Sequence, residues 1–248
     1  MLRKRLITVL TFNNGILFRT RNFIPDYRYT ANFIDLWSID EMVLLDITRP
    51  GQGERNNFYN IVSHIAQKCF VPVSVGGGIK TIDEMKYLLR IGADKIIVNT
   101  EAVNQPDLIE KSSKLFGTQC IVVSIDAKKN ESCEYEVFTS FGRKKTGLFP
   151  SEWAKKCQEL GAGEILITSI DKDGMLEGYD NNLTSSVSKI VDIPVLACGG
   201  AGRWHDFVDG FILGGASAVC TTNIYHFTEI SIKSAKEYLY SSDIMVRI

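Results

Sequence analysis

Eight short apolar runs, separated by longer stretches with helical periodicity, restrict the fold of this 248-residue chain more than any other feature. The runs are residues 6–10, 42–45, 71–75, 95–98, 120–125, 165–168, 194–197 and 218–221. Their lengths are typical of strands buried on both faces, and intervening helices require such strands to be parallel. Because eight strand–helix units close into a barrel in about 250 residues, we expect an α/β fold, a single (βα)8 TIM barrel.

The chain also repeats itself at an offset of about half its length. Residues 71–78 (VPVSVGGG) are echoed by residues 193–200 (IPVLACGG), and residues 91–100 (IGADKIIVNT) by residues 214–223 (GGASAVCTTN). We therefore interpret the single domain, residues 1–248, as two four-unit halves, about 1–119 and 120–248. Each half then supplies one glycine turn and one Asn or Thr strand end, which suits a ligand with a phosphate at each end.

Candidate phosphate-binding residues follow the apolar runs, at the strand ends where parallel barrels keep their chemistry. A single glycine turn is more often only a tight connection, but two at matched positions favour a ligand site. Asn and Thr at strand ends also satisfy local backbone groups, and the sequence does not choose between these roles. The candidates are Gly77, Gly78, Asn99, Thr100, Asp173, Gly174, Gly199, Gly200, Thr222 and Asn223.

Four charged residues mark the opposite, N-terminal ends of the expected strands. Arg5 and Lys95 are cationic, and Glu41 and Glu164 are anionic. Any one of them alone would be interpreted as an ordinary surface charge. Together they predict a neutral ring around the barrel axis, and the desolvation cost of such a ring suggests a specific role such as a gate.

Composition limits the partners and cofactors. The net charge is −1 and the sequence has no basic run that would attract nucleic acid or an anionic membrane, so we expect neither partner. The six cysteines form no CxxC pair, and those at 120, 198 and 220 lie in apolar runs as small buried residues. The three histidines lack ligand spacing, so we expect no metal and no cofactor. The N-terminal apolar run is too short for a signal segment, which predicts a reduced, cytoplasmic protein.

Short motifs are spread along essentially the whole chain. They are residues 4–5 (KR), 45–48 (LDIT), 75–79 (VGGGI), 92–95 (GADK), 125–128 (IDAK), 161–166 (GAGEIL), 168–171 (TSID), 199–202 (GGAG) and 226–227 (HF). In this order they resemble the cyclase subunit of imidazole glycerol phosphate synthase, a histidine-biosynthesis barrel. The resemblance implies a glutaminase subunit docked on the N-terminal face, ammonia passing through the core, and a bis-phosphorylated substrate at the other face.

The resemblance also assigns roles to individual residues. Arg5, Glu41, Lys95 and Glu164 fall on the family's ammonia-gate positions. Asp94 falls on an aspartate that meets the glutaminase. Five of the phosphate candidates fall on or beside the family's phosphate-site positions: Gly78, Asn99, Thr100, Gly200 and Thr222. The resemblance therefore implies an intact ammonia side.

The catalytic pattern is incomplete by comparison. The family uses two aspartates, at the ends of the first and fifth barrel strands, because ring closure needs one group to give a proton while another takes one. Asp126 matches the aspartate of the fifth strand, but Thr11 stands where the aspartate of the first strand is expected. A hydroxyl is far too weakly acidic to replace a carboxyl. Arg19 replaces the family's lysine, and residues 21–30 form a shorter, more aromatic covering segment. We expect weak or absent cyclase (lyase) activity.

This combination resembles family paralogues found with bacterial surface-polysaccharide (lipopolysaccharide) genes. In those systems a cyclase-like barrel and a glutaminase-like partner supply ammonia to an ATP-using N-acetyl-sugar amidotransferase, which converts an acetamido group into an acetamidino group. Three alternatives stay open: an authentic cyclase subunit, the related phosphoribosyl aldose–ketose isomerase, and a non-catalytic phosphate-binding scaffold. The gate residues favour the ammonia systems over the last two.

Overall fold

Eight parallel strands form a closed ring in the computed structural model, which describes residues 3–28, 39–221 and 232–247. The ring closes because β7 pairs with β10 and β12 pairs with β1. Each predicted apolar run overlaps one of these strands, so the predicted TIM barrel is confirmed. In ring order the strands are β1 (Arg5–Asn13), β4 (Glu41–Asp46), β5 (Val73–Gly76), β6 (Lys95–Val98), β7 (Ile121–Lys129), β10 (Glu164–Ser169), β11 (Val195–Cys198) and β12 (Ala218–Thr221).

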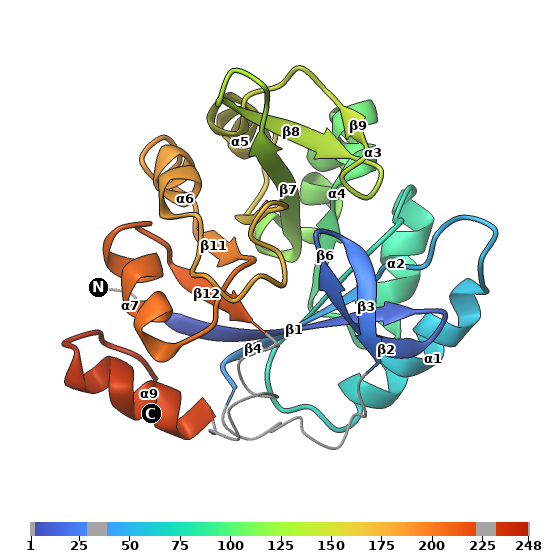
Figure 1. Ribbon diagram of the computed structural model, residues 1–248. Helices are drawn as coiled ribbons and strands as arrows, with labels where there is room; N and C mark the ends of the chain where they lie inside the picture. Colours follow the sequence, from blue (N-terminus) through green and yellow to red (C-terminus); the bar gives the residue numbers. More distant parts are fainter. Residues whose placement is uncertain (1–2, 29–38, 222–231, 248) are drawn as a thin grey trace.

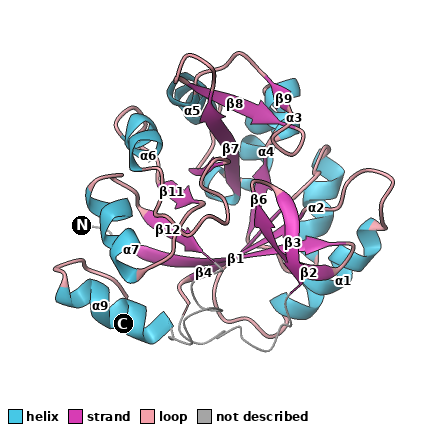
Figure 2. Cartoon of the chain, in the orientation of Figure 1, coloured by secondary structure: helices cyan, strands magenta, loops and turns pink. Residues whose placement is uncertain are grey.

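Helices surround this ring, as Figures 1 and 2 show. They are α1 (Arg55–Ala66), α2 (Ile82–Arg90), α3 (Thr100–Asn104), α4 (Asp107–Phe116), α5 (Pro150–Glu159), α6 (Asn181–Ser188), α7 (Trp204–Ile212) and α9 (Ile232–Ser241). A 3-10 turn, η2 (Thr118–Cys120), leads into β7. Across the described ranges, no helix combines the length and apolar character needed to span a bilayer.

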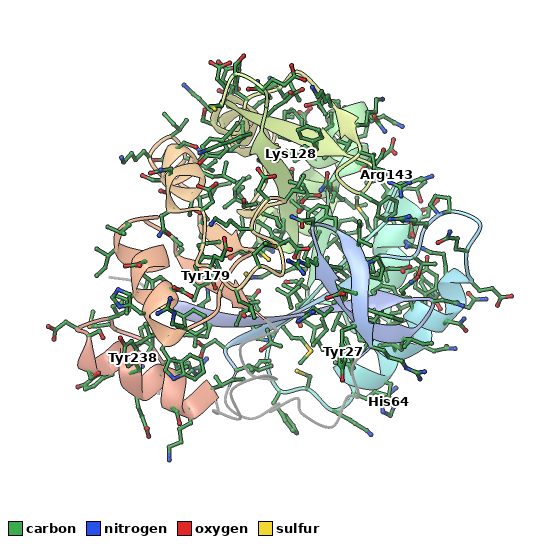
Figure 3. All side chains as sticks on the ribbon, viewed as in Figure 1. Tyr27, His64, Lys128, Arg143, Tyr179 and Tyr238 are labelled. Carbon is green, nitrogen blue, oxygen red and sulfur yellow. The ribbon has the colours of Figure 1, made fainter. Side chains whose placement is uncertain are left out.

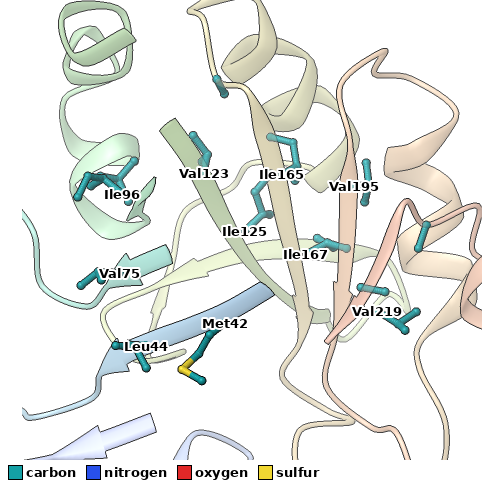
Figure 4. Close-up of a cluster of buried hydrophobic side chains, with 14 of the residues drawn as sticks. Met42, Leu44, Val75, Ile96, Val123, Ile125, Ile165, Ile167, Val195 and Val219 are labelled. Carbon is teal, nitrogen blue, oxygen red and sulfur yellow. The ribbon is translucent and has the colours of Figure 1, made fainter. Parts of the chain in front are cut away.

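Side chains alternate between two environments along the barrel strands, because successive residues of a strand point to opposite faces. The outward set packs beneath the helices, and Figure 4 shows ten of its members labelled. The inward set forms a separate apolar cluster that fills the lumen of the barrel. This lumen cluster comprises Ile7, Val9, Val43, Ile97, Val122, Leu166, Leu196, Ala218 and Cys220, with Leu45 and Cys198 packed against it.

A hairpin extends β1 beyond the predicted run. Asn14 and Gly15 have φ of 48° and 76°, which suits a tight turn, and β2 (Ile16–Arg21) then pairs antiparallel with β1. A second turn leads into β3 (Ile24–Arg28), which pairs with β2. The segment predicted as a covering loop, residues 21–30, is therefore partly strand; residues 29 and 30 lie outside the described ranges.

A second hairpin follows β7. β8 (Tyr135–Thr139) pairs antiparallel with β7, and β9 (Lys144–Lys145) pairs with β8. The Tyr135 hydroxyl donates to Asp180 Oδ1 at 2.7 Å, which ties this hairpin to the start of α6. Both hairpins rise from the C-terminal ends of barrel strands, so they frame one end of the lumen.

The C-terminal helix is held by a buried ion pair. Lys236 Nζ on α9 donates to Asp40 Oδ1 at 2.7 Å, and the two side chains are 9% and 4% exposed. The other carboxylate oxygen of Asp40 accepts the amide of Leu6 at 2.9 Å. This pair therefore joins α9 to the beginnings of β1 and β4.

We predict that Lys236→Met, which keeps the apolar stem but leaves Asp40 buried and unpaired, lowers the free energy of unfolding by about 3 kcal/mol. Urea unfolding of the purified chain measures this change. Lys233→Met, on the exposed face of the same helix, is the matched control and should change stability by less than about 0.5 kcal/mol. Equal effects of the two variants would contradict a stabilising role for the pair.

Candidate active site and charged ring

A cavity of about 610 Å³ lies at the C-terminal ends of the barrel strands. Its wall includes the β2–β3 hairpin, the turns after β5 and β11, and the loop after β10. The structure brings ten of the sequence-predicted site residues to this wall, whereas Thr222 and Asn223 lie outside the described ranges. The ten are Thr11, Gly77, Gly78, Asn99, Thr100, Asp126, Asp173, Gly174, Gly199 and Gly200.

Asp126 is a cavity carboxyl with a strongly raised pKa. Burial raises its pKa to about 7, and the nearby charge of Asp173 acts in the same direction. Two donors oppose this rise: Asn99 Nδ2 lies 2.6 Å from Asp126 Oδ2, and Ser124 Oγ lies 3.2 Å from Oδ1. A carboxyl that titrates near neutral pH is suited to act as a general acid or base.

Asp173 anchors the β2–β3 hairpin over the cavity. Its carboxylate accepts the Thr20 hydroxyl at 3.1 Å and the Phe23 amide at 3.0 Å. Burial raises the pKa of Asp173, while these two donors and the charge of Arg19 lower it. Asn22 reinforces the contact by donating to the carbonyl of Ile170 at 3.0 Å. The hairpin is thus fastened to the loop after β10 by polar contacts.

Thr11 faces the cavity without an acidic group. Its hydroxyl donates to the carbonyl of Phe18, its antiparallel partner on β2. The hydroxyl proton is therefore already used by the backbone, and only the oxygen lone pairs face the cavity. Thr11 contributes neither a carboxylate nor a free proton donor.

The two glycine turns are required by backbone packing, whatever they bind. A Cβ on Gly77, which has φ of 100°, would lie 2.1 Å from the carbonyl oxygen of Asp46. A Cβ on Gly200, with φ of 113°, would lie 2.2 Å from that of Gly178. The helix starts that follow are already capped, α2 by Thr81 and α7 by Asp206. Phosphate binding at these turns stays a prediction, and it would depend on amides before the helices.

Asn99 and Thr100 have local partners as well as an open position. Thr100 Oγ1 accepts the amide of Ser140 at 3.1 Å, and the Asn99 amide group donates to Asp126. Within the described part of the chain, the buried Asn99 Oδ1 has no hydrogen-bond partner. This oxygen is a buried, unsatisfied acceptor beside the cavity.

An arginine that the sequence interpretation missed organises the Gly77 side of the cavity. Arg55 Nη1 donates to Asp46 Oδ2 at 3.0 Å and to the carbonyl of Gly77 at 2.6 Å. Its other terminal nitrogen pairs with Glu84, which also accepts the Tyr59 hydroxyl at 2.9 Å. No local motif marks this network, because its members come from different strand–helix units.

The four predicted gate residues form a closed ring at the N-terminal end of the lumen. Arg5 Nη1 lies 2.6 Å from Glu41 Oε2 and 2.9 Å from Glu164 Oε1. Lys95 Nζ lies 3.0 Å from Glu164 Oε2 and also pairs with Glu41. Burial lowers the pKa of Arg5, but the two carboxylates raise it by more. Each charge has two opposite neighbours, so the ring is neutral.

The ring separates two spaces. A second cavity lies on its outer side and is lined by Arg3, Lys4, Arg5, Asp40, Glu41, Pro72, Lys95 and Arg247. On its inner side the lumen cluster leads to Val9, Leu45 and Ile97, which also line the large cavity. The barrel axis therefore passes from a charged ring through an apolar layer to a polar cavity.

Asp94 directly precedes Lys95, so it lies beside the charged ring, and its side chain is exposed. Its Oδ2 accepts the amide of Val73 at 2.8 Å, which leaves the other oxygen free to face outward. The exposed carboxylate is thus fixed in place at the N-terminal face.

The two histidines in the described ranges, His64 and His205, lie on different helices. His64 lies on α1 at the edge of the molecule (Figure 3), and His205 lies on α7, beside Asp209. His226 falls outside the described ranges. Among the residues that the structure describes, no three His, Cys, Asp or Glu side chains form a group that could hold a metal ion.

Comparison with known proteins agrees with this geometry. The family described as "Histidine biosynthesis protein" matches residues 8–231. Imidazole glycerol phosphate synthase subunit HisF from Hydrogenobaculum sp. (strain Y04AAS1) is 45% identical over 253 residues, covering 100% of both chains. The same subunit from Clostridium botulinum (strain Okra / Type B1) is 44% identical over 254 residues, also covering 100% of both. The chain belongs to the HisF family.

Membership of the HisF family confirms the resemblance inferred from the motifs. In this HisF-family chain the ion-pair ring and the Asp126 cavity lie at opposite ends of one lumen. The two ends therefore have different chemistry: fixed, paired charges at one, and a titrating carboxyl at the other.

We predict that Asp126 destabilises the folded chain as pH rises. Its folded pKa of about 7 lies above the unfolded value of 3.8, so between pH 4 and pH 7 the folded state keeps a proton that the unfolded state loses. Asp126→Asn removes this cost, and its stability gain over the unaltered chain should grow from pH 4 to pH 7, by at most about 4 kcal/mol. Urea unfolding at several pH values measures it.

A direct titration checks the cause. The carboxyl carbon shift of Asp126 in NMR should give an apparent pKa near 7. Asp173→Asn, which keeps one acceptor oxygen for one of the two donors, Thr20 or Phe23, should lower that pKa by removing the neighbouring charge. A gain from Asp126→Asn that is flat from pH 4 to pH 8 would contradict the assignment.

Proposed function

We propose that this chain is the barrel subunit of a glutamine-dependent amidotransferase. In this proposal it binds a glutaminase subunit at its N-terminal face, and ammonia crosses the lumen to an acceptor in the Asp126 cavity. The observation that carries the proposal is the stacking of a neutral charged ring, an apolar lumen and a polar cavity along one axis. The named relatives are subunits of imidazole glycerol phosphate synthase, which supports a partner subunit.

The charged ring suits a gate that discriminates by charge. Ammonium carries a charge and would lose its hydration in the apolar lumen at high cost, whereas neutral ammonia loses little. Glu41 is 3% exposed and accepts from Arg5, Lys95 and Ser74, so its charge is satisfied without a ligand. Lys95 is the flexible member of the ring, because its single ammonium ends a four-carbon stem. Passage would require Lys95 to move aside while Arg5 keeps the two carboxylates paired.

The group that accepts the ammonia is inferred from the absence of a second acid or base at Thr11. Ring closure needs a second acid or base opposite Asp126, and Thr11 supplies none. We therefore propose that the ammonia serves amidation of an N-acetyl sugar of the bacterial surface, performed with an ATP-using amidotransferase. In this role the cavity passes ammonia onward and still binds a phosphate-bearing small molecule at Gly77–Gly78 or Gly199–Gly200.

We predict that Asp94→Ala weakens binding of the glutaminase-like subunit by about two- to fivefold, the range expected for one exposed ion pair. Glutamine hydrolysis at limiting barrel concentration should fall by the same factor. Asp94→Asn is the matched control, because it keeps an acceptor for the Val73 amide but removes the charge. If the charge makes the contact, both variants weaken binding; if only Ala does, Asp94 merely supports β5. Unchanged binding in both would refute the proposed docking role.

A second candidate function is the cyclase reaction of the HisF relatives themselves. The observation in its favour is the electrostatic coupling of two buried carboxyls, Asp126 and Asp173, whose pKa values are both raised. Asp173 would then act as the second acid or base, the role that Thr11 does not supply. Its oxygens already accept Thr20 and Phe23, so the hairpin would have to release it during the reaction.

We predict that the purified barrel, supplied with an ammonium salt and the family's bis-phosphorylated substrate, turns over about a hundredfold to ten-thousandfold more slowly than a HisF relative assayed alongside. Thr11→Asp should raise the rate. Thr11→Val, which has a similar shape and no carboxyl, is the control and should leave it low. Turnover equal to that of the relative, abolished by Asp173→Asn, would instead establish the cyclase function.

A third possibility, a non-catalytic phosphate-binding scaffold, makes a different prediction from both. A scaffold would bind a bis-phosphate ligand without stimulating any glutaminase. The glutamine hydrolysis assay with Asp94 variants therefore also separates the scaffold from the ammonia systems.

A further inference from the structure

Cys198 on β11 and Cys220 on β12 form a pair of thiols inside the lumen. The two residues are register partners across the parallel β11–β12 pair. Both side chains point inward, because both pack in the lumen cluster and both line the large cavity. The two thiols are therefore neighbours on one face of the sheet.

This spacing is compatible with a disulfide. Neighbouring strands lie about 4.8 Å apart, and disulfides join residues whose Cα atoms are about 4.4–6.8 Å apart. Both cysteines are free in the structure. A bond between them would join two residues that are already register partners.

The two thiols differ in access. Cys198 is half-buried and open to the cavity, whereas Cys220 is buried. Burial, together with the neighbouring Cys198, raises the pKa of the Cys220 thiol well above its usual value. Cys198 is therefore the thiol that a small polar reagent in the cavity meets first, and Cys220 is the thiol behind it.

The other cysteines are not arranged in this way. Cys157 is buried on α5, Cys133 is exposed in the turn before β8, and Cys69 and Cys120 pack against the outer core cluster. Register, common direction and access to the cavity together distinguish the Cys198–Cys220 pair from these four.

We propose that Cys198 and Cys220 are an oxidation site, at which a peroxide entering the cavity converts the two thiols into a disulfide between β11 and β12. The thiolate of Cys198 attacks one peroxide oxygen, the O–O bond breaks, and the departing hydroxide takes a proton to become water. The sulfur of Cys220 then attacks the resulting sulfenic sulfur, and the S–O bond breaks. The second hydroxide leaves as water with the Cys220 proton. Two thiols and one hydrogen peroxide give one disulfide and two waters.

The position of this bond connects it to the cavity. Cys198 is the register partner of Thr168 on β10, and Thr168 is that of Asp126 on β7. The disulfide would therefore lie in the wall of the cavity, two strands away from Asp126. It is independent of which acceptor the cavity serves.

The test treats the purified chain with hydrogen peroxide, unfolds it, and counts free thiols. We expect two of the six thiols to be lost, with a mass decrease equal to two hydrogen atoms, and restored by dithiothreitol. Peptide mapping should find Cys198 linked to Cys220. Cys198→Ser and Cys220→Ser should each prevent the linkage. Cys133→Ser, which removes an exposed cysteine, is the matched control and should still lose two thiols.

Mapping of the unaltered chain decides the result even if a variant fails to fold. Six free thiols after treatment, a linkage between any other cysteines, or conversion of Cys198 to sulfinic acid without a linkage would each overturn the proposal. Each outcome is independent of glutaminase binding and cyclase turnover, so the proposed function and the oxidation site are tested separately.

Discussion

Closure of the parallel ring through the β7–β10 pair determines where every functional side chain lies. In the closed ring, successive side chains of each strand point alternately into the lumen and into the layer beneath the helices. The lumen set runs in order along each strand, from Arg5 through Ile7 and Val9 to Thr11 on β1. Two other strands repeat this order of charged, apolar and polar residues: β6 with Lys95, Ile97 and the following Asn99, and β10 with Glu164, Leu166 and Thr168. The arrangement of ring, lumen and cavity is therefore a consequence of register.

The charged ring is stable because its members come from four different strands at one level. Glu41 and Glu164 are nearly buried, and either carboxylate without its partners would carry a large desolvation cost. Arg5 and Lys95 each contact both acids, so removing one cation still leaves each acid one partner. Such a ring tolerates the temporary displacement of one member better than an isolated pair would. This tolerance is the physical reason to assign movement to Lys95 and a fixed position to Arg5.

Sequence reasoning predicted the barrel and the ring because both follow from local patterns repeated along the chain. It did not predict the Arg55 network or the Asp40–Lys236 pair, whose members are brought together only by the tertiary fold. The β1–β2 hairpin was predictable, because the dipeptide Asn14-Gly15 favours a tight turn. The turn at Asn22 and Phe23 was not predictable from the sequence, because a phenylalanine with φ of 63° is rare. The facing thiols were predictable from alternation alone, as Cys198 follows Leu196 on the inward side.

An apolar layer separates the cavity from the charged ring. This separation explains how the cavity can carry Thr11 in place of a carboxyl while all four charges of the ring stay paired. Thr11 hydrogen-bonds to β2, and Asp126 to Asn99 and Ser124, so neither contacts the charged ring. A change of acid to hydroxyl at position 11 therefore leaves Arg5, Glu41, Lys95 and Glu164 paired. It does alter the cavity, where Asp126 and Asp173 are the neighbouring carboxyls with raised pKa values. Under the proposed function, a barrel that passes ammonia but lacks one proton-transfer group would deliver ammonia more readily than it would close a ring.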